Sequence, residues 1–258
     1  MTGRAVLLDI DGVLCVEDEP VAGAVVAVEQ LRAARRHLRF VTNTTNQPRA
    51  AILAKLVRLG FTIADDELIT PASLAVRICR ERGHERVALF VAPGAEVDFD
   101  GLGVVGVRAA AQAVIVGDLG EAWDYATLNR AFRLMIDGAD LIALQKNRFW
   151  RRADGLSLDA GPFVAALEYA TGRIATVSGK PSPDFFEQAL AGAGVTAAEA
   201  TMVGDDVESD VGGALRAGLA AILVRTGKYR HDVVVASGIE PTATVNSIAD
   251  VPALLDAT

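Results

Sequence analysis

Short apolar runs alternate with longer amphipathic segments along most of the chain. Runs rich in Val, Leu, Ile and Ala predict buried strands at 5–11, 38–43, 86–91, 113–118, 140–145, 174–180, 201–206 and 220–227. Between them, apolar residues recur at helical spacing and predict helices at 24–37, 125–136 and near 162–171. This alternation is typical of βαβ units. We therefore expect an α/β fold, a Rossmann-like three-layer core with a mostly parallel sheet.

Two further helices are marked by their boundary residues. Pro48 precedes the segment AAILAKLVRL, and Gly60 follows its end. Pro71 opens ASLAVRICRER, and Gly83 closes it. Proline near the first turn and glycine after the last turn are the usual boundary signals of a helix.

Polar residues collect where several predicted strands end. Asp9 and Asp11 lie at the end of the run AVLLDIDGVL, and Thr42 and Asn43 end the next strand. Lys180 and Asp205 occupy similar positions much later in the chain. Parallel sheets bind ligands beyond the carboxyl ends of their strands, so we expect these side chains to converge on one site.

Composition narrows the class of protein. The chain has 258 residues, 51% of them hydrophobic, which is ordinary for a globular protein. Its net charge of −8 argues against a nucleic-acid surface, and no apolar run approaches the roughly 20 residues of a membrane helix. The segment before the first predicted strand is only a few residues long, so we expect no signal peptide. Cys15 and Cys79 lack metal-ligand spacing, so we expect a protein of the reducing cytoplasm.

The strand-end residues match what hydrolysis of a phosphate ester requires. A nucleophile must attack phosphorus, an acid must protonate the leaving oxygen, and cations must neutralise the phosphoryl oxygens. Asp9 can be the nucleophile, Asp11 the acid and base, and Thr42 a hydroxyl donor. Lys180 can be the cation and Asp205 a ligand to Mg²⁺, which prefers carboxylate and backbone oxygens.

Four motifs in this order make the sequence resemble the haloacid dehalogenase-like hydrolases. They are DIDGVL, VTNTT, SGKPSP and GDDVESD. The resemblance implies that Asp9 forms an aspartyl-phosphate and that the Asp11 carbonyl also touches Mg²⁺. It implies that the Thr42 hydroxyl and the Asn43 amide hold the phosphoryl group, and that Lys180 steadies both. Asp205 would be a metal ligand, and Asp210 and Asp206 would lie next to the ligands without binding the ion themselves. Acidic residues such as Asp206 are also favoured at the start of a helix.

The long interval between the second and third motifs implies an inserted cap. We expect a core at 1–80 and 178–258, with a smaller α/β cap of the type-two group at 81–177. FVTNTT, AFRLMIDGADLIAL, PFVAALEYATG and GDDVESDVGGA are similar to the phospholysine phosphohistidine inorganic pyrophosphate phosphatase branch. Some members of that branch carry Ser or Asn at the position of Asp11, from which this chain departs.

The cap contains a basic and aromatic run from Lys146 to Arg152. Lys146 and Asn147 could bind substrate, or the run could be a hairpin with Phe149 and Trp150 packed or in a dimer contact. The resemblance allows a homodimer through the cap. The segment GLGVVG at 101–106 matches a dinucleotide motif but has no adjoining strand before it.

The sequence thus predicts a Mg²⁺-dependent phosphatase that acts on a small phosphorylated substrate. The bond cleaved is a phosphate monoester, a phosphoramidate or a pyrophosphate bond. The alternative within the same superfamily is a phosphotransferase acting on a small sugar or nucleotide phosphate. A receiver-like switch also uses clustered Asp, Thr and Lys, but receivers are about half this length and lack a cap.

Overall fold

The computed structural model describes residues 3–106, 109–152 and 155–257. Its contacts divide the chain into two compact units. The core unit comprises Met1–Thr42, Ala50–Ile69 and Lys180–Thr258, and the inserted unit comprises Asn43–Arg49 and Thr70–Gly179. The sequence boundary at residues 80 and 81 assigned helix α3 (Pro71–Glu81) to the core, whereas its contacts assign it to the inserted unit.

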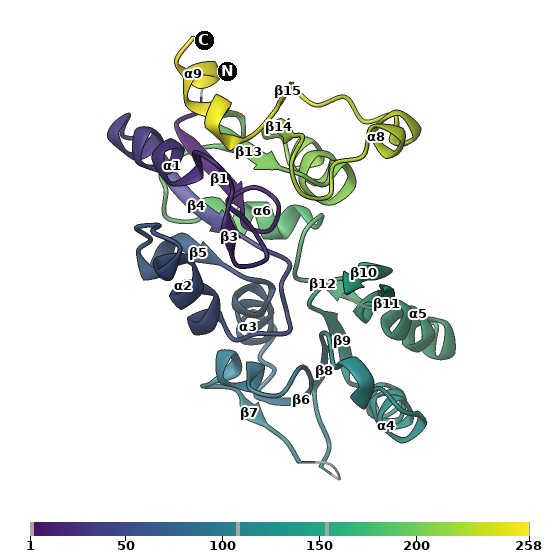
Figure 1. The fold of residues 1–258 in the computed structure, drawn as a ribbon. Coiled ribbons are helices and arrows are strands. Elements are labelled where there is room, and N and C mark those ends of the chain that lie inside the picture. The colour runs from purple at the N-terminus through teal and green to yellow at the C-terminus, as the bar shows by residue number, and fades with distance from the viewer. Residues whose placement is uncertain (1–2, 107–108, 153–154, 258) are drawn as a thin grey trace. The chain divides into compact units, whose positions relative to one another are not determined.

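A six-stranded parallel sheet forms the centre of the core unit (Figure 1). Its strands, in spatial order, are β15 (Ala243–Val245), β14 (Ala220–Val224), β13 (Ala200–Gly204), β1 (Ala5–Asp9), β4 (His37–Val41) and β5 (Leu68–Ile69). Every residue of β1 and β13 is buried. These two strands lie in the middle of the sheet with helices over both faces, which explains their continuous apolar runs.

Helices of the core unit pack around this sheet, and all of them except the one at His231–Ser237 have buried residues. They are α1 (Ala24–Ala33), α2 (Arg49–Arg58), α6 (Pro183–Leu190), α7 (Gly213–Arg216), α8 (His231–Ser237) and α9 (Val251–Asp256). In α1 the buried residues are Ala24, Ala27, Val28 and Leu31, the spacing of one helical face. They pack with β1, β4 and β14 side chains into one apolar core. A π-helical turn, η5 (Val207–Gly212), precedes α7, and a hairpin of β2 (Cys15–Val16) and β3 (Glu19–Pro20) follows β1.

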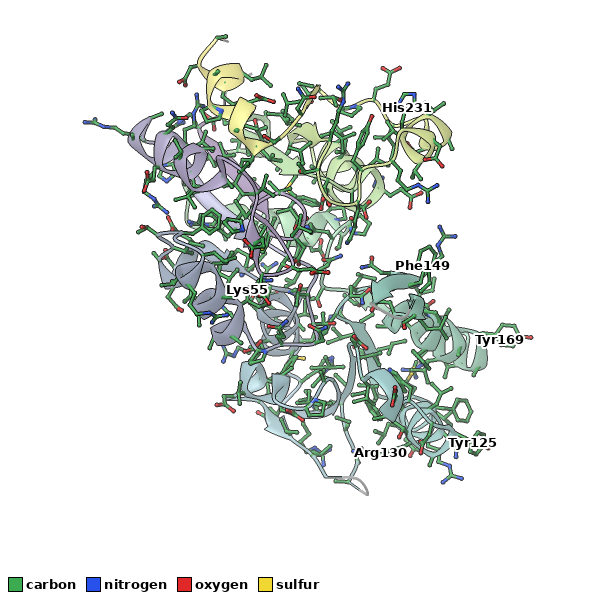
Figure 2. The ribbon with its side chains drawn as sticks, in the orientation of Figure 1. Lys55, Tyr125, Arg130, Phe149, Tyr169 and His231 are labelled. Atoms are coloured by element: carbon green, nitrogen blue, oxygen red, sulfur yellow. The ribbon has the colours of Figure 1, made fainter. Side chains whose placement is uncertain are left out.

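The inserted unit has its own five-stranded parallel sheet. The order is β12 (Thr176–Val177), β9 (Asp140–Ala143), β8 (Ala113–Val116), β6 (Arg86–Phe90) and β7 (Gly103–Val104). Helices α4 (Tyr125–Ile136) and α5 (Ala160–Thr171) belong to this unit, as does an antiparallel hairpin of β10 (Phe149–Arg152) and β11 (Gly155–Leu158). Trp123 stacks between Phe90 and Phe163, with ring centroids 5.8 and 4.8 Å away, and so joins β6 to α5. Figure 2 shows Tyr125 and Tyr169 pointing outward from α4 and α5, and both are strongly exposed.

The α/β fold predicted from the sequence is confirmed, and the differences lie at element ends. The predicted helix 24–37 ends at Ala33, because Arg35 takes a positive φ of 57° that turns the chain into β4. The predicted strand 174–180 pairs only at Thr176–Val177. Among the described residues, no helix is long and apolar enough to cross a membrane.

Candidate active site

The carboxyl ends of three neighbouring strands bring three predicted site residues together in the core unit. Asp9 is the last residue of β1 and pairs in register with Val41 of β4, so Thr42 follows directly beside it. On the other side Leu8 is in register with Val203 of β13, and Asp205 comes directly after that strand. All three residues are buried. The parallel register therefore places these three residues at one edge of the sheet.

A cluster of carboxylates forms at this edge. Asp9, Asp205 and Asp210 each offer an oxygen, and these oxygens lie within 4.8 Å of one another. Asp210 reaches the cluster from η5, the π-helical turn after β13. A Cβ atom on Gly204 would lie 2.2 Å from the Asp210 Cβ, so only glycine leaves room for this approach.

Lys180 lies inside the same cluster and is buried with it. Its Nζ is 2.7 Å from Asp9 Oδ1 and 2.7 Å from Asp210 Oδ1. Burial by itself lowers the pKa of Lys180, but the carboxylates of Asp210 and Asp9 raise it overall. Lys180 therefore stays protonated and holds the Asp9 carboxylate in one position.

The carboxylates outnumber the buried cations, and their protonation reflects this. Burial and the charge of Asp210 raise the pKa of Asp9 well above its usual value, against the opposing effect of Lys180. Burial and Asp210 likewise raise the pKa of Asp205 to about 7. Three acids with one ammonium ion leave excess negative charge in a buried place, which is costly without a further cation.

The residues present fit a divalent cation at this point. Oδ1 of Asp205 is buried and accepts no hydrogen bond within the described residues, while Oδ2 accepts one from the Lys228 amide at 2.6 Å. An oxygen left over in this way, beside two further carboxylates, is the hard donor set that Mg²⁺ prefers.

The loop after β14 supports Asp205 from the other side. The Thr226 hydroxyl donates to the Gly12 carbonyl at 2.5 Å. Gly12 and Gly227 both have positive φ, 88° and 60°, and a Cβ on either would lie within 2.0 Å of Asp205 Oδ2. Two glycines thus allow two loops to close around one carboxylate.

Asp11 and Asp206 take different positions. Asp11 is half-buried, two residues beyond Asp9, and forms an isolated bridge with Cys15. Asp206 precedes η5, and its Oδ1 accepts hydrogen bonds from the amides of Glu208 and Ser209 at 2.9 and 3.0 Å. Asp206 therefore caps a helical turn, whereas Asp210 joins the carboxylate cluster, a distinction that the spacing of GDDVESD does not reveal.

The remaining predicted residues belong to the inserted unit. Asn43 lies close to Gly179, since a Cβ atom added to Gly179 would be 2.8 Å from Asn43 Oδ1. Lys146 forms an ion pair with Glu168 at 2.8 Å, and the Asn147 carbonyl accepts from the Gly161 amide. Phe149 is 54% exposed. The side chains of Trp150, Arg151 and Arg152 lie outside the described part.

A buried polar cluster follows the strands of the inserted sheet. Gln145 donates from Nε2 to Asp159 Oδ1 and accepts from the Asn147 amide. Asp159 also caps α5 by accepting from the Ala160 amide at 2.7 Å, and burial raises the pKa of its carboxyl. Nearby, Thr45 Oγ1 accepts from the amide of Asp118. Gln145 and Asp159 thereby fix the backbone at Lys146 and Asn147.

Sequence reasoning missed Lys228 and the loop that carries it. The only available signal was the tripeptide Thr226, Gly227 and Lys228 at the end of a predicted strand, in the same position as the other site residues. A single lysine after a predicted strand does not by itself indicate a site, so this signal is weak.

Comparison with known proteins finds a family, curated relatives and solved structures that are similar to this chain. The family model described as haloacid dehalogenase-like hydrolase matches residues 6–105, and a second, HAD-hydrolase-like model matches residues 177–251. Human haloacid dehalogenase-like hydrolase domain-containing protein 2 is 47% identical, with 88% of this chain and 86% of that protein aligned. Human phospholysine phosphohistidine inorganic pyrophosphate phosphatase is 42% identical, over 88% of this chain and 84% of its own.

Two of the solved structures that are similar to this chain are phosphatases by name. The p-nitrophenyl phosphatase of Archaeoglobus fulgidus superposes with a TM-score of 0.92 at 27% identity, covering 99% of this chain and all of its own. The glycerol phosphate phosphatase of Mycobacterium tuberculosis, solved in complex with magnesium, gives 0.83 at 27% identity, over 96% of this chain and 75% of its own.

Fold and site together define a hydrolase built on an α/β core. The chain belongs to the haloacid dehalogenase-like hydrolase family. The expectation of an enzyme of the phosphatase class is confirmed.

Proposed function

We propose that the enzyme is a Mg²⁺-dependent phosphatase that works through an aspartyl-phosphate on Asp9. The observation that supports this most is the Asp9 carboxylate itself. It is buried at a strand end, held by Lys180 at 2.7 Å, and grouped with two further carboxylates. A rigid strand end positions a nucleophile within the tolerance that in-line attack on phosphorus demands.

The first step transfers the phosphoryl group to the enzyme. An Asp9 oxygen forms a bond to phosphorus while the bond from phosphorus to the leaving group breaks, and Asp11 gives its proton to the departing atom. Thr42 and the Asn43 amide hold the phosphoryl oxygens. Lys180 keeps Asp9 in the direction of attack.

The second step releases phosphate. Asp11, now a carboxylate, takes a proton from water as the water oxygen attacks phosphorus. The bond between phosphorus and Asp9 then breaks, and orthophosphate leaves. Asp9, Asp205 and the Asp11 carbonyl would hold Mg²⁺, with Asp210 beside them. When bound, the ion supplies positive charge that keeps Asp9 ionised and neutralises the phosphoryl oxygens.

The substrate class is proposed from chemistry and from relatives. Names of relatives and structural neighbours include phospholysine, phosphohistidine, pyrophosphate, nitrophenyl phosphate and glycerol phosphate. We propose a small phosphate monoester, phosphoramidate or pyrophosphate for this chain, with the inserted unit as a cap that selects the leaving group. Phosphotransfer to a second substrate is the alternative, and an acceptor competing with water would reveal it.

Two further proposals concern the molecule's setting. Cys15 and Cys79 are buried free thiols, which supports a reducing cytoplasm. Pairing of two copies through the inserted unit stays a prediction, and light scattering on the purified protein would test it.

The test uses p-nitrophenyl phosphate with and without Mg²⁺, for the wild type and for Asp9→Asn. We expect Mg²⁺-dependent turnover by the wild type. In the variant we expect a loss of at least about a thousandfold, as is usual when a covalent nucleophile is removed. Circular dichroism checks that the variant folds. Near-normal activity of a folded Asp9→Asn protein would overturn the proposal, and so would a wild-type turnover rate that does not change when Mg²⁺ is removed.

A further inference from the structure

The negative charge of the carboxylate cluster around Asp9 repels a phosphate group that enters the site. Lys180 is already engaged by Asp9 and Asp210, each at 2.7 Å and both buried. Its charge is therefore largely balanced before substrate arrives. A phosphate dianion approaching these carboxylates needs another positive group besides the metal ion.

The loop after β14 contains Lys228, whose backbone contacts the carboxylate cluster. Its backbone is fixed to the site at two points: the Thr226 hydroxyl donates to the Gly12 carbonyl, and the Lys228 amide donates to Asp205 Oδ2 at 2.6 Å. Gly227 between them lies against Asp205 and Gly12 so closely that no Cβ fits. The Lys228 side chain therefore starts from a point in direct contact with a proposed metal ligand.

The Lys228 side chain itself is available to a ligand. The residue is exposed, and among the described residues no carboxylate lies within ion-pair distance of its Nζ. Its backbone amide nevertheless contacts Asp205, so the side chain starts at the edge of the carboxylate cluster. A lysine ammonium ion is charged at neutral pH, and this one has no ion-pair partner within the described residues.

We propose that Lys228 is a second substrate-contacting cation, whose ammonium group binds the phosphoryl oxygens of substrate and of the product orthophosphate. This inference rests on the proposed function, since it assumes that phosphate enters beside Asp9. Lys180 then orients the nucleophile, while Lys228 contacts the anion. Each of the two lysines carries a positive charge, but only Lys228 is proposed to contact the phosphoryl group.

Isothermal titration calorimetry of orthophosphate into the Mg²⁺-saturated protein tests this without turnover. Lys228→Gln should weaken orthophosphate binding by at least about tenfold, the loss expected for one charge-assisted hydrogen bond. Lys228→Arg should restore binding to within about threefold. Lys228→Met, which keeps the apolar stem, should match the Gln variant. Lys55→Gln, a matched control at a lysine of the same unit that lies 3.9 Å from Asp18, should bind like the wild type.

A titration with Mg²⁺ alone separates phosphate contact from support of the metal site. We expect the affinity of Lys228→Gln for Mg²⁺ to be unchanged or slightly higher, because a nearby positive charge has been removed. Unchanged orthophosphate affinity, or a loss matched by an equal loss of Mg²⁺ affinity, would overturn the role. A wild type that binds orthophosphate but hydrolyses no phosphate ester would contradict the proposed function alone.

Discussion

Individual residues at this site are defined by how little space surrounds them. Asp205 is enclosed by Gly12 on one side and Gly227 on the other, and its Oδ2 is held by the Lys228 amide. This enclosure directs the remaining oxygen, Oδ1, away from protein donors. The two glycines therefore fix the position of a carboxylate that we propose as a metal ligand, although they carry no ligand atom themselves.

The substitution Gly12→Ala tests this enclosure. A Cβ at residue 12 would lie 1.9 Å from Asp205 Oδ2, so the carboxylate must move. We expect at least about a tenfold loss of Mg²⁺ affinity by calorimetry, the factor that corresponds to 1.4 kcal/mol. Gly94→Ala is the matched control, because Gly94 has the same φ of 88° but no atom within 4 Å of its Cβ position.

Both variants carry the backbone strain of an alanine at positive φ, about 1–2 kcal/mol. Equal Mg²⁺ affinities in the two variants would show that Gly12 serves the backbone turn alone.

Sequence could place some of these residues and not others, for a physical reason. Asp9 ends a strand, Thr42 and Asp205 each come directly after one, and the parallel register brings these strand ends together. Asp210 enters through a π-helical turn, whose wider spacing ordinary helical periodicity does not predict. The position of Lys228 depends on a loop whose Thr226 contacts Gly12 at a sequence separation of 214, and no local pattern encodes such a contact.

At the scale of the elements, two acidic residues of the turn after β13 have different roles. Asp206 satisfies amide groups at the start of η5, and Asp210 turns inward to Lys180. The amide of Asp206 also donates to Asp210 Oδ2 at 3.2 Å, so the cap and the cluster are linked through one short segment.

The substitution Asp206→Ala separates the two tasks. We expect the free energy of unfolding to fall by about 1 kcal/mol, the usual cost of losing a helix cap, with little change in Mg²⁺ affinity. Chemical denaturation measures the first quantity and calorimetry the second. Asp232→Ala is the control, since Asp232 pairs with Arg230 on an exposed surface and should alter stability much less.

A strong loss of Mg²⁺ affinity in Asp206→Ala, with stability intact, would instead place Asp206 in the metal's surroundings, as the family resemblance implied.

Elements with several apolar residues were predictable, and very short ones were not. The five buried residues of β1 and of β13 give a clear run, whereas β2, β3 and β7 pair over two residues each. A two-residue strand has no period to detect. Pairing with a neighbouring strand, rather than local sequence, determines whether such segments become strands.

Across the whole molecule, the excess acidity of one buried cluster should make stability depend on pH and on metal. Burial and the charge of Asp210 raise the folded-state pKa of Asp205 to about 7, far above its unfolded value of 3.8. Between these values the folded state keeps a proton that the unfolded state has lost. Stability of the metal-free protein therefore falls as pH rises from about 4 to about 7, because the unfolded state binds fewer protons.

Thermal unfolding with Mg²⁺ and with EDTA, at pH 5 and at pH 7.5, measures this dependence. Mg²⁺ should raise Tm more at pH 7.5, where it binds ionised carboxylates, than at pH 5, where protons compete for them. Asp205→Asn should reduce both the pH dependence in EDTA and the gain from Mg²⁺. Equal gains in Tm at both pH values would contradict a metal site built on these carboxylates.

The proposed covalent intermediate on Asp9 can be tested most directly by trapping it. Asp11→Asn should slow the second step most, because water then lacks its base, while nitrophenolate leaves without needing an acid. Acid quenching of this variant after mixing with p-nitrophenyl phosphate and Mg²⁺, followed by peptide mass spectrometry, should find a phosphoryl group on the peptide that contains Asp9. The double variant Asp9→Asn with Asp11→Asn should show none. A phosphoryl group on another residue, or none in a variant that still turns over, would contradict the account.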